Sequence, residues 1–95
     1  MRDYELVVIL NPEVAEEDVP SAIEKVSQFI TQKGGAVADV NHWGRRRLAY
    51  PIEHFMEGNY VITQFKLEPN LTSELEAELR LSDQILRHLL IRAGD

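Results

Sequence analysis

The chain has 95 residues, of which 44% are hydrophobic, and its formal net charge is −6. This length suffices for one compact domain, and we expect a single domain over residues 1–95. The absence of cysteine excludes disulfides and thiolate metal sites and is compatible with a reducing cytoplasm. The acidic balance argues against strong unassisted binding to polyanions, because nonspecific nucleic-acid affinity comes from clustered Lys and Arg.

The N-terminal third of the chain predicts a strand followed by a helix. Residues 3–10 are rich in β-branched and aromatic side chains and end at the turn signal Asn11-Pro12. Over residues 16–33, apolar side chains recur at steps of three and four, as in an amphipathic helix: Val19, Ile23, Val26 and Ile30. Gly34-Gly35 should end this helix, because glycine accepts the left-handed conformation after a helix.

Residues 36–52 predict one long extended segment. Its alternation places Val40, Leu48, Tyr50 and Ile52 on one face, and Asp39, Trp43, Arg45 and Arg47 on the other. Val37 is out of phase with this alternation, so we expect a β-bulge near it.

The C-terminal half predicts a strand, a helix and a last strand. We expect a connection at residues 54–57 and then a strand over residues 60–67, paired as a hairpin with the segment before it. Pro69-Asn70 should open a helix over residues 71–81, in which Leu71, Leu75 and Leu79 form one row. Residues 85–92 complete the series as a strand.

The order β-α-β-β-α-β indicates an α+β, ferredoxin-like split arrangement. Right-handed crossovers then place both helices on one face of a four-stranded antiparallel sheet, with strand order 4-1-3-2. The N-terminus differs from a signal peptide, and no apolar run reaches membrane-spanning length. We therefore expect no membrane association.

One face of this sheet should lack a helical cover. The predicted apolar side chains on that face are Val7, Ile9, Trp43, Tyr60 and Ile62. A contiguous apolar surface on a small domain commonly marks a protein interface. The alternative is a hydrophobic central strand that is tolerated without a partner.

The cationic residues form one cluster, Arg45-Arg46-Arg47. Guanidinium groups match phosphate oxygens in pairs, and the neighbouring Trp43 or Tyr50 would suit stacking on an unpaired base. Along a strand, Arg45 and Arg47 should share one face and Arg46 the other. The alternative is a solvated edge that protects against strand-to-strand aggregation.

Catalytic chemistry has no support in the sequence. His42, His54 and His88 lie on different predicted elements and match no His-Glu-x-x-His or nucleophile-elbow spacing, so we expect structural or surface histidines. The acidic residues of the helices are expected to be solvated exteriors rather than a binding surface for a basic protein. We predict no catalytic residue, no metal site and no cofactor.

Several segments carry a resemblance to a known family. They are Tyr4-Glu5, Leu10-Asn11-Pro12, Gly44-Arg45-Arg46-Arg47-Leu48-Ala49-Tyr50-Pro51-Ile52, Gly58-Asn59-Tyr60, and Leu79-Arg80 through Asp83. Together they resemble ribosomal protein six of the bacterial small subunit, and the match spans nearly the whole chain.

The resemblance implies a structural, non-enzymatic ribosome component in the cytoplasm. It implies binding to small-subunit ribosomal RNA together with ribosomal protein eighteen, and an indirect relation to ribosomal protein fifteen through the RNA. By position in the matched segments, RNA or partner contact falls to Arg46, Arg47, Tyr50, Arg80 and Arg87, with Arg45 as a further candidate. Family members often continue in a C-terminal tail, whereas this sequence stops at Asp95.

Two other functions share the predicted topology. A free RNA-recognition motif reads bases through aromatics on its two central strands, but the first strand here offers Glu5, Val7 and Ile9 at those positions. A small acyl-phosphate hydrolase would need an Arg after the first strand, and no Arg follows Leu10 there. Both alternatives rank below the ribosomal interpretation.

Overall fold

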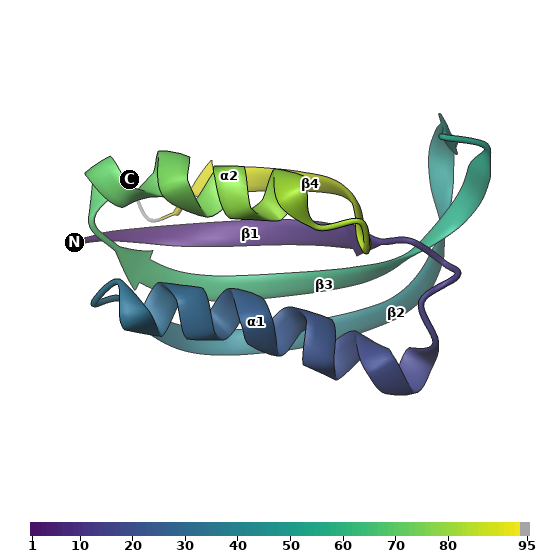
Figure 1. Cartoon of the computed structure of the whole chain (residues 1–95). Helices are drawn as coiled ribbons and strands as arrows, with labels where there is room; N and C mark the ends of the chain where they lie inside the picture. Colours follow the sequence, from purple (N-terminus) through teal and green to yellow (C-terminus); the bar gives the residue numbers. More distant parts are fainter. Residues whose placement is uncertain (94–95) are drawn as a thin grey trace.

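The computed structural model describes residues 1–93 and shows a β-sheet with both α-helices on one side (Figure 1). The elements in chain order are β1 (Arg2–Leu10), η1 (Glu16–Asp18), α1 (Val19–Gln32), β2 (Ala36–Ile52), β3 (Phe55–Leu67), η2 (Pro69–Leu71), α2 (Thr72–Leu81) and β4 (Ile85–Arg92). The sheet order is β2-β3-β1-β4, with every neighbouring pair antiparallel. This is the predicted order 4-1-3-2 read in reverse, so the ferredoxin-like fold is confirmed. Residues 94 and 95, the end of the expected 1–95 domain, lie outside the described residues.

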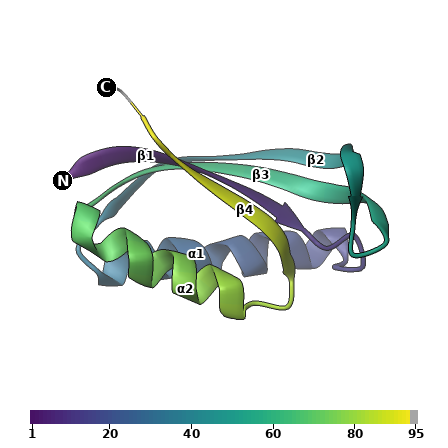
Figure 2. The same cartoon turned by 90° about the horizontal axis from the view of Figure 1, so that it is seen from above.

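The hydrophobic core lies between the sheet and the two helices, which form separate layers in Figure 2. Alternate residues of β1 face the helices, and Leu6, Val8 and Leu10 are each 0% exposed. They share one cluster with Ile30 of α1 and Leu75 of α2. Full burial of each such side chain contributes roughly 1.5–3 kcal/mol, so the helix-covered face supplies most of the stability of the fold.

The end of α1 follows the prediction from Gly34-Gly35. Gly34 has φ +88°, which glycine adopts without steric cost. Its N–H donates to the carbonyl of Thr31 at 3.1 Å, and the N–H of Gly35 donates to the carbonyl of Ile30 at 2.9 Å. This pair of bonds is the Schellman arrangement. The start of the helix is less regular than expected, because residues 16–18 form the 3-10 turn η1 before α1 begins.

The connection between β2 and β3 is shorter than predicted. Strand β3 begins at Phe55, which pairs with Ile52, so the turn consists of Glu53 and His54 alone. These residues have φ values of 47° and 75°, as a two-residue type I′ hairpin turn requires. The expected connection at residues 54–57 is therefore wrong. Neither turn residue is Gly or Asn, so the usual sequence signal for such a turn is missing.

Irregular pairing in β2 changes which residues share a face. One register shift falls between Val37 and Asp39 and confirms the bulge expected there, whereas a second, between His42 and Gly44, was not expected. Before the second shift the even-numbered Val40 pairs with Thr63, and after it the odd-numbered Arg45 pairs with Asn59. The single alternation predicted for residues 36–52 is therefore wrong, because an extra residue reverses the parity.

Candidate RNA and partner interface

The sheet face opposite the helices carries a strip of apolar side chains. Val7 pairs with Ile62 on one side and with Leu89 on the other, so the three side chains share this face. Val7, Tyr60 and Ile62 are half-buried, and Leu89 is 53% exposed. None of the four belongs to the core cluster under the helices. We call this strip, with Ile91 of β4, the open-face strip.

Leu89 and Ile91 are the members of the strip that the sequence analysis missed. Both are exposed and both lie on β4, where Leu89 pairs with Val7 and Ile91 pairs with Glu5. Their spacing of two residues was a usable signal, because such residues share one face of a strand. They extend the apolar surface from the sheet centre to the β4 edge.

Ile9 lies on the same face but is almost covered. It is 9% exposed and stands outside the core cluster. A Cβ added to Gly58 would lie 2.4 Å from its Cγ2 atom, so Ile9 occupies the space that a side chain at position 58 would need. Tyr60 and Arg87 line a shallow hollow together with Ile9. Ile9 therefore supports the open face and offers little surface of its own.

The arginine cluster divides between the two sides of the sheet, as its alternation predicts. Arg45 pairs with Asn59 and Arg47 with Glu57, whereas Arg46 pairs with Gly58. Nη2 of Arg45 donates a hydrogen bond of 2.8 Å to the backbone oxygen of Pro12. Arg45 is therefore already held by the chain itself.

Arg46 is associated with Trp43. Its guanidinium carbon lies 5.0 Å from the centre of the indole ring, within the range of a cation–π interaction. Trp43 is 47% exposed and lies at the second bulge. The structure thus joins Trp43 to Arg46, whereas the sequence placed it on the face of Arg45 and Arg47.

The far end of the β2–β3 hairpin bends over toward the start of β4 (Figure 1). This bend brings Tyr50 to Arg87, although the two are far apart in the sequence. The guanidinium group of Arg87 donates a hydrogen bond to the Tyr50 hydroxyl and lies 5.9 Å from its ring centre. Two predicted contact residues are therefore adjacent, and their contact ties the hairpin end to β4. We call residues 44–58 the hairpin arm.

Arg80 stands apart from the other candidates. It lies on α2, in the helical layer, and its Nη2 atom is 4.0 Å from a carboxylate oxygen of Glu76. The Arg80 side chain is exposed and that of Glu76 is partly buried, and such an i,i+4 pair contributes only a few tenths of a kcal/mol. The structure does not bring Arg80 together with the hairpin arm.

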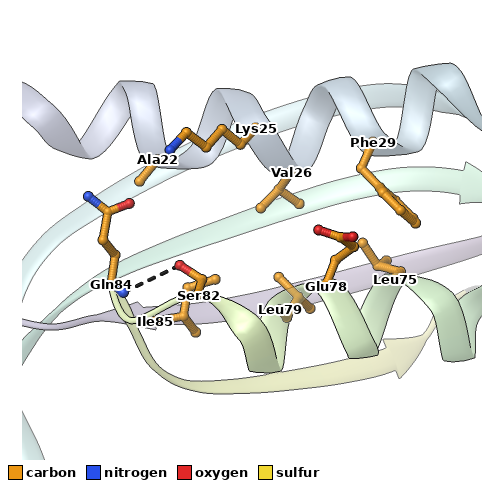
Figure 3. A pocket seen from close by; sticks show the side chains of 10 residues that line it. All are labelled: Ala22, Lys25, Val26, Phe29, Leu75, Glu78, Leu79, Ser82, Gln84 and Ile85. Atoms are coloured by element: carbon orange, nitrogen blue, oxygen red, sulfur yellow. Dashed lines mark hydrogen bonds between the residues drawn. The ribbon is translucent and has the colours of Figure 1, made fainter.

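The helical layer is acidic, in contrast to the arginine cluster of the hairpin arm. Its elements η1, α1 and α2 contain seven carboxylates, against the basic residues Lys25 and Arg80. Figure 3 shows a groove between α1 and α2 in which Val26, Phe29 and Leu79 point toward one another, with Lys25 and Glu78 beside them. The acidic character of this layer disfavours RNA, because phosphates need cations.

The three histidines lie apart, as expected. His54 is in the hairpin turn, His42 lies on β2, and Nε2 of His88 is 3.5 Å from a carboxylate oxygen of Glu76. Among residues 1–93, no group of three or more His, Cys, Asp or Glu side chains is placed to hold a metal ion. In the same part of the chain, no helix has the length and apolar character needed to cross a membrane.

These features define a class of protein: a ferredoxin-like binding domain with an acidic helical layer and an open sheet face that carries apolar and arginine side chains. Comparisons with known proteins identify the family. The sequence model described as Ribosomal protein S6 matches residues 3–92. The chain belongs to the ribosomal protein S6 family, whose members are structural components of the small ribosomal subunit and not enzymes.

Individual relatives match over nearly their full length. Small ribosomal subunit protein bS6 of Desulforamulus reducens is 44% identical over 95 residues, and the match covers all of both chains. The protein of the same name from Clostridium novyi is 45% identical over 91 residues, which is 96% of each chain. The crystal structure of 30S ribosomal protein S6 from Thermotoga maritima has a TM-score of 0.90 at 33% identity, covering 96% of this chain and 86% of that one. The family resemblance seen in the sequence is confirmed, and the interpretations as a free RNA-recognition motif or an acyl-phosphate hydrolase are wrong.

Proposed function

We propose that this chain, a cytoplasmic component of the small ribosomal subunit, binds small-subunit ribosomal RNA together with ribosomal protein eighteen. Ribosomal protein fifteen would act only indirectly, through the RNA. One observation carries the proposal: the open sheet face presents apolar side chains next to arginines, whereas the acidic residues of the helices lie on the other side of the sheet.

The protein partner would cover the open-face strip. Val7, Tyr60 and Ile62 lie at the sheet centre, and Leu89 is more exposed toward the edge. Burial of apolar surface stabilises a complex by roughly 25 cal/mol per Å², so a partner seated here gains affinity without any cation. The strip lies next to Arg87, which pairs with Ile9 on the same face. A partner bound to the strip would therefore adjoin the RNA contacts.

The RNA would contact the hairpin arm and its neighbour on β4. Arg46, Arg47, Tyr50 and Arg87 are the main candidates, with Arg45 and Arg80 as further ones. The segment over residues 40–52 contains three Arg and no acid. A chain of net charge −6 lacks the cations for strong solo binding, because affinity for phosphates rises with the number of contacts that Lys and Arg make. The proposed function therefore needs the second protein.

A binding assay tests the proposal. A labelled fragment of the central domain of small-subunit ribosomal RNA is titrated with the chain, with ribosomal protein eighteen, and with both at moderate salt. We expect weak binding by the chain alone and cooperative, much tighter binding by the pair.

Leu89→Asp should abolish the cooperativity, because it places a charge on the open-face strip. Leu81→Asp is the matched control, since Leu81 is 78% exposed on α2. Tight binding by the chain alone, or equal effects of the two variants, would contradict the proposal.

A further inference from the structure

We propose that Trp43 and Arg46 form a subsite for one unpaired nucleobase, which stacks on the indole ring while the guanidinium group contacts an adjacent phosphate. This inference rests on the proposed function and assigns a specific role to part of the same surface. It also moves Trp43 from the predicted protein-binding face to the RNA.

The exposure of Trp43 and the position of Arg46 carry the first step. An indole that is 47% exposed presents a large planar surface to solvent. The guanidinium carbon of Arg46 lies over the ring, 5.0 Å from its centre, so a positive charge already covers one face of the indole and a base would stack on the other. Nonspecific single-strand sites combine these two elements, an aromatic platform and a cation that follows the phosphate backbone.

The backbone around the pair leaves room for a ligand. Gly44, next to Trp43, has φ +84°, and a Cβ added there would meet no heavy atom within 4 Å. The residue paired with Arg46 is Gly58, which has no side chain. The space at Gly58 is filled by Ile9, so Gly44 is the residue that leaves the strand surface bare next to the indole, where a planar base can approach.

The charge of the surroundings favours RNA over a protein as the occupant. The hairpin arm has three Arg against Glu53 and Glu57, and Glu57 pairs with Arg47 whereas Arg46 pairs with Gly58, so Arg46 faces no carboxylate across the hairpin and suits a phosphate. Leu89 and Ile62 of the open-face strip instead lie at positions that pair with Val7, in apolar surroundings. The base must be unpaired, because a base inside an RNA helix is already stacked between its neighbours and cannot stack on a protein side chain.

The experiment uses Trp43 as its own probe, since it is the only tryptophan of the chain. The full chain is combined with ribosomal protein eighteen, in which any tryptophan is replaced by phenylalanine, and indole fluorescence is followed while the RNA fragment is added. We expect quenching that saturates with RNA binding. A fully base-paired RNA of the same length should produce little quenching.

Affinity measurements on variants complete the test. Trp43→Ala should weaken RNA binding by the protein pair about tenfold, in keeping with the loss of one base stack, and Trp43→Phe should retain most of the affinity. Leu81→Ala removes an exposed apolar side chain from α2 and should have no effect. Thermal unfolding of each variant checks that the fold is intact.

The outcomes separate this inference from the proposed function. If the pair binds RNA tightly but Trp43→Ala binds equally well, the subsite is wrong and the proposed function stands. If the fluorescence change is complete on adding ribosomal protein eighteen without RNA, a protein covers Trp43 and the subsite is again wrong. If the unmodified pair fails to bind RNA, both proposals are overturned.

Discussion

The two faces of the sheet differ in what covers their apolar side chains. Val7 and Val8 are neighbours in β1, yet Val8 is fully buried under the helices and Val7 is half-buried on the open face. The helix-covered face is closed by the chain's own α1 and α2, whereas the open face ends in exposed Leu89 and in Arg46 of the hairpin arm. The residues that stabilise the fold and those proposed to bind partners therefore lie on opposite sides of the same strands. Substitutions on one side should change stability, and substitutions on the other should change binding.

The largest effect on stability should come from a leucine on the covered face. Leu6→Ala removes a side chain that is 0% exposed and should lower the free energy of unfolding by about 2–5 kcal/mol. Leu89→Ala, on the exposed β4 position, should cost less than about 1 kcal/mol. Urea denaturation measures both. Equal losses would mean that the open face is part of the core.

The packing of Gly58 against Ile9 should give the next largest effect. Gly58→Ala brings a Cβ to 2.4 Å from Cγ2 of Ile9, and such overpacking costs about 1–3 kcal/mol. Combining it with Ile9→Ala should recover part of the loss in a double-mutant cycle. Additive losses in chemical denaturation would show that the two positions do not compete for space.

A smaller effect is expected on RNA affinity, which should depend on the hairpin arm and not on the helical layer. Arg46→Ala should weaken RNA binding by the complex with ribosomal protein eighteen about three- to tenfold and reduce its salt dependence, because one phosphate contact is lost. Lys25→Ala, on α1 in the acidic layer, is the matched control and should change neither. Filter binding at several salt concentrations measures the RNA affinity and its salt dependence for both variants. A larger effect of Lys25→Ala would place the RNA on the helices.

The smallest effect should come from the contact that ties down the hairpin arm. Tyr50→Phe removes the hydroxyl that accepts from Arg87 and should cost about 0.5–1 kcal/mol. Because the contact is local, amide hydrogen exchange should accelerate in the hairpin arm and stay unchanged in β1. Uniform acceleration throughout the sheet would show that the contact supports the whole fold.

Local sequence patterns predicted the fold well. The short-range signals are the β-branched and aromatic residues of β1, the helical spacing of Val19, Ile23, Val26 and Ile30, and the stop at Gly34-Gly35, and the structure follows each of them. The last strand has the predicted bounds. The predicted strand order is also confirmed, since few arrangements satisfy this order of elements.

The details of the candidate interface depended on features without a local signal. The bulge between His42 and Gly44 reversed the faces of β2 and brought Trp43 to Arg46, and one extra residue in a strand leaves little trace in a hydrophobic pattern. The contact of Tyr50 with Arg87 depends on the bend of the hairpin arm. The spacing of Leu89 and Ile91 shows that they share one face of β4, but that this face is the open one follows only from the pairing of β4 with β1.

Hydroxyl-radical footprinting of this chain, free and within assembled small subunits, tests the division between the two faces most directly. We expect Leu89 and Trp43, both exposed in the free chain, to become protected on assembly, while Leu81 of α2 stays reactive. Protection of Leu81 with continued reactivity of Leu89 and Trp43 would show that the particle contacts the helical layer and that the open face is not the binding face.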